Sequence, residues 1–286
     1  MMRQGEELHS MVDIDIREED KNAVNRYAFF MCGLKVVLLI PYFFLIFFFV
    51  MNVPGNSLMW QKYGHSYRIV ILAMLIIFIL YYLNKKRFFK KIYGIMLSQC
   101  DPHHMISYCG ALMKHVRREK SWGIQFYNIG AAFYYAGRIE DAKKVVWLMD
   151  KYKKTNRDLF LRRLLSGRIN FYEKNQEYLQ RDCEALTYLS KKVRMDKQTK
   201  FFFNVTLSQF KLLDLEFQGR YEEMYAMYES SYSYHHSMLA DVMKNYYMYQ
   251  AAKNMGNSEL AESHRQMVLK CGGTLWYKAD LENECR

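Results

Sequence analysis

Two long apolar stretches lie near the start of the chain. Residues 36–51 are all apolar, Pro or Tyr, sixteen in a row, and residues 28–34 add seven more on the other side of Lys35. A second stretch, residues 69–83, continues for fifteen residues without a charge. Because roughly 20 apolar residues cross a bilayer core as a helix, this pattern predicts two transmembrane helices within residues 28–84.

Turn residues and charges around these stretches predict their orientation. Pro54-Gly55-Asn56-Ser57 separates them and indicates a short extracytoplasmic loop. Residues 1–27 hold four basic and seven acidic side chains, which is typical of a flexible cytosolic tail rather than a signal peptide. Basic residues follow the second stretch, so the positive-inside rule predicts a multi-pass cell-membrane protein with both termini in the cytoplasm. The predicted membrane-edge cations are Lys35, Lys85, Lys86, Arg87, Lys90 and Lys91.

The remainder, residues 85–286, has the pattern of successive amphipathic helices. Asp101-Pro102 is typical of an N-cap followed by proline in the first helical turn, and apolar residues then recur at helical spacing. No proline occurs after Pro102, and glycine is scarce, with 14 in 286 residues. We therefore expect an all-α chain in which an N-terminal transmembrane hairpin precedes a cytoplasmic α-solenoid.

One segment carries a recognisable repeat motif. The sequence from residue 126 reads F-x2-I-G-x2-F and then, from residue 142, A-x3-V. This resembles the tetratricopeptide repeat, whose pattern is W-x2-L-G-x2-Y followed by A-x3-F. Small residues would let two antiparallel helices approach, large apolar residues would fill the seam, and a glycine would make the turn. The residues assigned to these structural roles are Phe126, Ile129, Gly130, Phe133, Gly137 and Ala142.

Weaker copies of the same turn follow, at residues 175, 219 and 256. The spacings of 38, 44 and 37 residues exceed the standard 34. Gly219, Gly256 and Ala261 take the corresponding structural positions, and residues 274–284 would form a terminal capping helix. The resemblance covers residues 102–272, and the whole chain is also similar to membrane-anchored repeat proteins of Gram-positive bacteria.

The resemblance implies an interaction scaffold whose concave groove is lined by the first helix of each pair. Tyrosine suits such a surface because it offers a large rigid area and a hydroxyl. One subfamily clamps a terminal carboxylate with Lys and Asn, but Tyr127 and Ala131 occupy those positions here, so the groove is expected to hold an extended or helical segment. The groove positions are Tyr127, Ala131, Tyr134, Tyr135, Leu165, Tyr172, Gln209, Glu216, Tyr246, Gln250 and Lys253.

Motifs for other functions are missing from the sequence. It contains no P-loop, G-x-S-x-G or H-E-x-x-H motif, no CxxC pair and no standard zinc spacing, so we predict neither an enzyme, nor a cofactor, nor a metal site. The formal net charge is +12, but acidic residues are interspersed in the helical part and no nucleic-acid motif occurs, so no nucleic-acid partner is expected.

Two main functional hypotheses follow, beside a third in which the chain is a peptide-sensing regulator. In the first, the chain is a membrane-anchored scaffold that binds protein or peptide partners at the cytoplasmic face of a lipid bilayer. In the second, it is an accessory subunit of a transporter, channel or secretion assembly, held through a Phe-rich face of its transmembrane hairpin. Self-association into a homo-oligomer is compatible with both.

Overall fold

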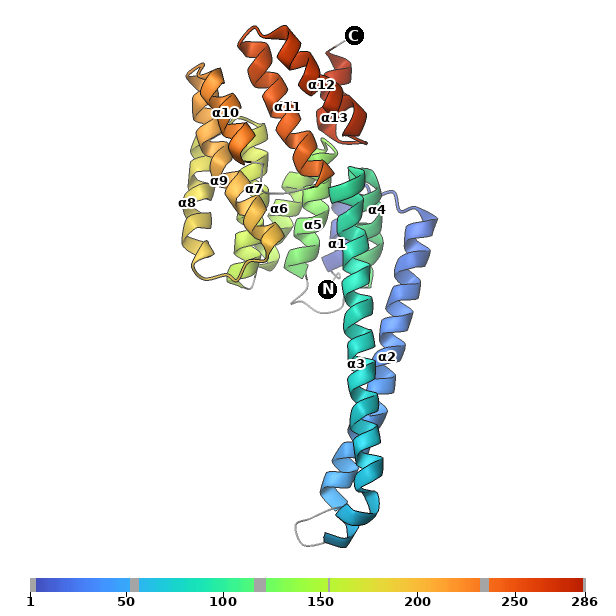
Figure 1. Ribbon diagram of the computed structural model, residues 1–286. Helices are drawn as coiled ribbons and strands as arrows, with labels where there is room; N and C mark the ends of the chain where they lie inside the picture. The colour runs from blue at the N-terminus through green and yellow to red at the C-terminus, as the bar shows by residue number, and fades with distance from the viewer. Residues whose placement is uncertain (1–3, 52–56, 116–121, 154, 232–236, 285–286) are drawn as a thin grey trace. The chain divides into compact units, whose positions relative to one another are not determined.

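A computed structural model describes most of the chain (Figure 1). The described residues are 4–51, 57–115, 122–153, 155–231 and 237–284. This part of the chain forms thirteen helices and no strand, which confirms the all-α prediction. The helices form two compact units, one made of Met1–Arg17 with Tyr93–Arg286 and the other of Glu18–Ile92.

The Glu18–Ile92 unit contains α2 (Glu18–Met51) and most of α3 (Ser57–Gln99), which lie side by side (Figure 1). Three acidic residues occupy the first turn of α2, where they favour helix formation by interacting with the helix dipole. The ring of Tyr27 stacks on Phe88, with centroids 3.5 Å apart. Many apolar side chains described on these helices are exposed, among them Phe29 and Ile69.

The predicted transmembrane hairpin is not supported. Among the described residues, no helix is both long enough and apolar enough to cross a membrane, which contradicts the predicted spans within 28–84 and the multi-pass membrane localisation. Each uncharged stretch alone is shorter than about 20 residues, and the prediction reached that length only by extending past Lys35 and Arg68. The turn predicted at Pro54-Gly55-Asn56 lies outside the described residues. The second functional hypothesis, an accessory subunit held through its transmembrane hairpin, depended on the same spans and therefore loses its basis.

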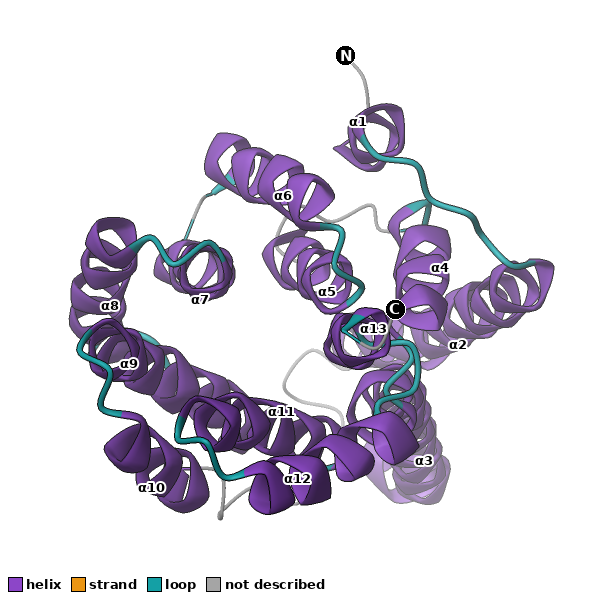
Figure 2. Cartoon of the chain, turned by 90° about the horizontal axis from the view of Figure 1, so that it is seen from above, coloured by secondary structure: helices purple, strands orange, loops and turns teal. Residues whose placement is uncertain are grey.

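The other unit is built from pairs of helices that follow one another along the chain. After the end of α3, α4 leads into four pairs, α5 with α6, α7 with α8, α9 with α10 and α11 with α12, and α13 follows the last pair. The bounds are α4 Pro102–Met113, α5 Trp122–Tyr135, α6 Ile139–Tyr152, α7 Asn156–Tyr172, α8 Gln176–Ser190, α9 Lys197–Phe217, α10 Tyr221–Ser231, α11 Met238–Asn254, α12 Ser258–Cys271 and α13 Trp276–Asn283. Figure 2 shows these pairs following a curve, with α5, α7 and α11 on its inner side and α6, α8, α10 and α12 on its outer side. This is an α-solenoid-like arrangement.

The same turn closes all four pairs. Gly137, Gly219 and Gly256 each have a positive φ, between 69° and 76°, and each lies two residues after the end of the first helix of a pair. At Gly137, the next residue's N–H donates to the carbonyl of Phe133 (2.9 Å) and the glycine N–H donates to the carbonyl of Tyr134 (3.0 Å). This is the Schellman arrangement, which favours glycine because a side chain is strained at positive φ. In the second pair Lys174 takes this position, with a φ of 54°.

The N-terminal segment also differs from the expected flexible tail. Residues Gln4–Met11 form α1, in which Leu8 is fully buried. Glu7 on this helix accepts hydrogen bonds from Lys151 and Tyr152 of α6. His9 Nε2 donates to the carbonyl oxygen of Gly110 in α4 (3.2 Å). The net charge of the segment favoured a solvated tail, but a few well-placed apolar and polar side chains are enough to hold it on the repeats.

Candidate functional site

The most elaborate side-chain cluster lies on the inner side of the curve, where α13 packs. Figure 2 shows α13 beside α5 and α11, inside the curve rather than stacked beyond α12. Tyr277 and Leu281 on this helix are fully buried, and Leu275 just before it is almost so. The terminal helix therefore packs against the surface that the sequence predicted to be a binding groove.

Aromatic side chains from three other helices meet those of α13. The Trp276 ring lies 5.0 Å from Tyr172 of α7 and 5.2 Å from Tyr246 of α11, both edge to face. The Tyr277 ring lies 4.9 Å from Tyr246 and 6.4 Å from Tyr135 of α5. Such edge-to-face and tilted pairs contribute about 0.5–1.5 kcal/mol each beyond the burial of apolar area. We call this set, with Tyr134 and Tyr247, the inner aromatic cluster.

Polar contacts hold α13 along α11. The hydroxyl of Tyr246 donates to Asp280 Oδ2 (2.5 Å). One helical turn further on, Tyr249 and Lys253 both donate to Glu284, the lysine at 3.0 Å. Partial burial opposes ionisation of Glu284, but these hydrogen bonds prevail and lower its pKa. Burial and the bond to Asp280 raise the pKa of Tyr246, so its hydroxyl remains a donor at neutral pH.

A second attachment fixes the segment that enters α13. The Thr274 N–H donates to the carbonyl of Cys100 (3.0 Å), and its hydroxyl donates to Asp101 Oδ1 (2.9 Å). Asp101 also accepts from the His104 N–H (3.0 Å), which confirms its predicted role as the N-cap of α4. Partial burial opposes ionisation of Asp101, but these bonds lower its pKa.

The predicted groove residues are mostly covered. Tyr172 and Lys253 are exposed, whereas Glu216 and Gln250 are partly buried. Glu216 pairs with Lys174, at 2.5 Å. Those that the fold buries are Tyr127, Ala131, Tyr134, Tyr135, Leu165, Gln209 and Tyr246. Tyr135, Tyr172 and Tyr246 thus belong to the predicted set, but they contact α13 of the same chain.

Sequence reasoning missed the residues that occupy the inner side. They are Trp276, Tyr277, Asp280, Leu281 and Glu284, in a segment interpreted only as a terminal capping helix. Their spacing was a usable signal, because aromatic, acidic and apolar residues recur on one face of this helix. It also missed Arg168 of α7.

Arg168 is a buried cation below this surface, with an exposure of 1%. Its Nη1 donates to the hydroxyl of Tyr135 (3.0 Å), and its guanidinium carbon lies 4.1 Å from the centre of the Phe202 ring. The Tyr127 and Tyr135 rings are also within cation–π distance, at 5.9 and 5.4 Å. Among the described residues, Nε and Nη2 of Arg168 have no hydrogen-bond partner. Aromatic faces are thus its main compensation for lost hydration.

The residues assigned to repeat structure occupy the seams between helices. Phe126, Ile129, Phe133 and Ala142 are between 0% and 1% exposed, and Ala261 is buried as well. Gly130 is required by close approach, because a Cβ there would lie 2.4 Å from Leu165 Cδ2. The predicted membrane-edge cations Lys35, Lys85, Lys86, Arg87, Lys90 and Lys91 are all exposed. With the transmembrane spans contradicted, no membrane-edge role is assigned to them.

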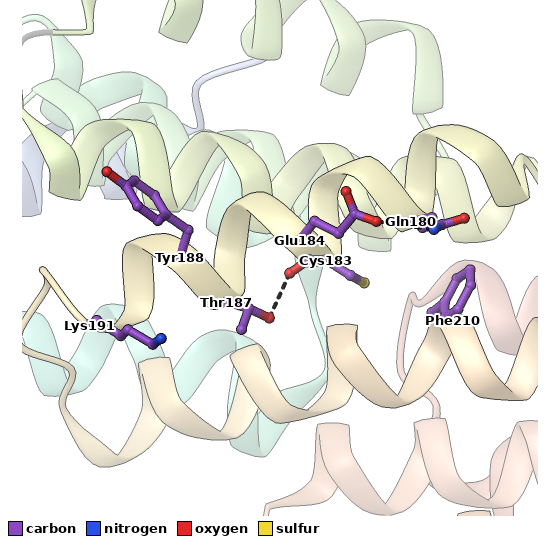
Figure 3. A pocket seen from close by; sticks show the side chains of 7 residues that line it. All are labelled: Gln180, Cys183, Glu184, Thr187, Tyr188, Lys191 and Phe210. Carbon is purple, nitrogen blue, oxygen red and sulfur yellow. Dashed lines mark hydrogen bonds between the residues drawn. The ribbon is translucent and has the colours of Figure 1, made fainter.

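A separate shallow pocket lies on the outer side, between α8 and α9 (Figure 3). Cys183 faces it, but burial raises the pKa of its thiol to about 12, so it is not an activated nucleophile. The Thr187 hydroxyl donates its proton to the Cys183 carbonyl (2.8 Å). The other lining residues, Gln180, Glu184, Tyr188, Lys191 and Phe210, form no catalytic arrangement.

Within the described part of the chain, no group of three His, Cys, Asp or Glu side chains is placed to hold a metal ion. The described cysteines are all free thiols. Comparison of the chain with protein-family models, with curated proteins and with solved structures finds no match.

Proposed function

We propose that the unit formed by Met1–Arg17 and Tyr93–Arg286, called here the helical-repeat unit, binds a protein or peptide segment on its inner side and acts as a scaffold for that partner. The observation that carries the proposal is the inner aromatic cluster with α13 packed on it. A helix held there by aromatic contacts and a few hydrogen bonds demonstrates the chemistry that this surface offers: rigid apolar area, phenol hydroxyls and a lysine. The resemblance of residues 102–272 to tetratricopeptide repeats points to the same class of function.

The test compares two exposed tyrosines on opposite sides of the unit. Tyr172 is 41% exposed beside Trp276 on the inner side, and Tyr188 is 61% exposed on the outer helix α8. The full chain and its Tyr172→Ala and Tyr188→Ala variants would be purified from the native cell, and co-purifying proteins would be quantified by mass spectrometry.

We expect a near-stoichiometric partner to co-purify with the full chain. Its amount should fall at least tenfold with Tyr172→Ala and remain unchanged with Tyr188→Ala. A partner retained by both variants would place the interface elsewhere and refute the proposal. Circular dichroism of both variants would show that each substitution leaves the helices intact.

A further inference from the structure

The residues by which α13 contacts the inner side follow the pattern of a helical ligand. Taking Tyr277 as position i, the contacting residues are Asp280 at i+3, Leu281 at i+4 and Glu284 at i+7. Tyr277 and Leu281 have no exposed surface, and the two acids hydrogen-bond to α11. This spacing places all four on one helical face, the arrangement by which amphipathic helices bind grooves in other proteins.

The helix depends on that surface for its own stability. It is only eight residues long, and Leu275 at its N-cap makes no side-chain capping bond. A helix this short is marginal in water without tertiary contacts, so α13 folds by packing onto the inner side. It is joined to α12 through Gly272 and Gly273, the second of which has a φ of 53°. The helix α13 therefore resembles a ligand bound to the inner side, to which it is connected through two glycines.

The resident helix also satisfies the surface incompletely. Within the part of the chain that the structure describes, two buried guanidinium nitrogens of Arg168 and the Trp276 Nε1–H have no hydrogen-bond partner. The acids of α13 lie along α11 and pair there with Tyr246, Tyr249 and Lys253 rather than with Arg168. A buried guanidinium with unsatisfied N–H groups is unfavourable, so a segment that reached Arg168 with an acidic group would be held more tightly than α13.

We propose that α13 is an intramolecular stand-in for the partner, which displaces it. The occupant of the site is a helical segment of another protein with an aromatic residue, an acid and an apolar residue one turn later, and a second acid a turn beyond. This inference rests on the proposed function and gives it a partner chemistry and a built-in competitor. Because α13 competes at high effective concentration, the surface is closed to weak ligands and opens to segments that bind it more tightly than α13 does.

The test uses a fluorescently labelled peptide with the sequence of residues 274–284 and measures its binding to the full chain by anisotropy. In one chain variant the resident helix is weakened by Tyr277→Ala with Leu281→Ala. We expect the variant to bind the peptide at least tenfold more tightly than the unmodified chain, where α13 competes at high effective concentration. The control chain, Glu282→Gln, changes the exposed face of the same helix and should bind like the unmodified chain.

Peptide variants examine the chemistry. Asp280→Asn with Glu284→Gln in the peptide should weaken binding several-fold, and Tyr277→Ala with Leu281→Ala should abolish it. If the chain with Tyr277→Ala and Leu281→Ala keeps its helicity but does not bind the peptide, the inference is wrong. Loss of helicity in that chain would also overturn it, because a displaceable segment requires a surface that folds without it. A chain with Asp280→Asn and Glu284→Gln, which keeps every apolar contact, should also gain peptide binding, and no gain would count against displacement.

The two proposals fail separately. If the peptide does not bind but Tyr172→Ala still loses the cellular partner, the scaffold function stands and displacement falls. If the peptide binds but the partner survives Tyr172→Ala, the inner side holds α13-like segments and the cellular interface lies elsewhere.

Discussion

The second helix pair offers a direct measurement of backbone strain, because Lys174 occupies a position that glycine holds in the other three pairs. Its φ is 54°, and a residue with a side chain loses roughly 1–2 kcal/mol in the left-handed region. Replacing it by glycine relieves that strain but adds conformational freedom to the unfolded chain, which costs about 0.4–1 kcal/mol. The net gain expected from Lys174→Gly relative to Lys174→Ala is therefore about 1 kcal/mol.

The alanine variant is the necessary reference. Lys174 Nζ lies 2.5 Å from Glu216 Oε1 in an exposed ion pair worth at most about 1 kcal/mol, and both substitutions remove it equally. The reverse change is Gly219→Ala, where a Cβ would meet no atom within 4 Å, so that only backbone strain is introduced. This variant should lose about 1 kcal/mol.

Urea unfolding of the full chain, followed by circular dichroism at 222 nm, measures these differences. The midpoint of Lys174→Gly should exceed that of Lys174→Ala at an unchanged slope. Gly219→Ala should unfold at a lower urea concentration than the unmodified chain. Equal midpoints for the two variants at 174 would refute the assignment of a strained, glycine-type turn to this pair.

Three further predictions concern single side chains. Hydrogen bonds from Lys151 and Tyr152 lower the pKa of Glu7, so its contribution to stability is present at pH 7 and is lost as the pH falls below about 4.3. In urea titrations, the difference between the unmodified chain and Glu7→Gln should therefore be larger at pH 7 than below about pH 4, and a difference that does not change with pH would contradict this assignment. Partial burial raises the pKa of the Cys183 thiol to about 12, so an alkylating reagent at pH 8 should modify the exposed Cys32 before Cys183. Faster labelling of Cys183 than of Cys32 would contradict this prediction. The free energy of unfolding of Arg168→Met should lie within about 2 kcal/mol of that of the unmodified chain, because the loss of cation–π contacts is offset by the removal of a poorly paired buried charge. A loss above about 4 kcal/mol in urea unfolding would show instead that the charge is well compensated.

Features that depend on neighbouring residues were open to prediction from the sequence. The helical class follows from periodic apolar residues and the scarcity of proline and glycine. The turns at Gly137, Gly219 and Gly256 are set by the need for positive φ within a few residues, and the cap at Asp101 is set within one turn. Such features survive any rearrangement of the rest of the chain, because their causes are local.

Residue type alone was insufficient where the surroundings decide the outcome. The length of an uncharged stretch suggested transmembrane spans that the described helices do not support. Tyrosines on the first helix of each pair were predicted to line an open groove, but whether a tyrosine faces solvent or another ring depends on what packs above it.

Tertiary structure alone decided the placement of both ends of the helical-repeat unit. It brings Glu7 to Lys151, and it brings Trp276 and Tyr277 to Tyr172 and Tyr246, across long separations in sequence. It also buries Arg168 among aromatic rings. The free energy of each such contact depends on helices that lie far away in the sequence. The sequence therefore determined the amphipathic faces, and tertiary packing decided which of these faces meet.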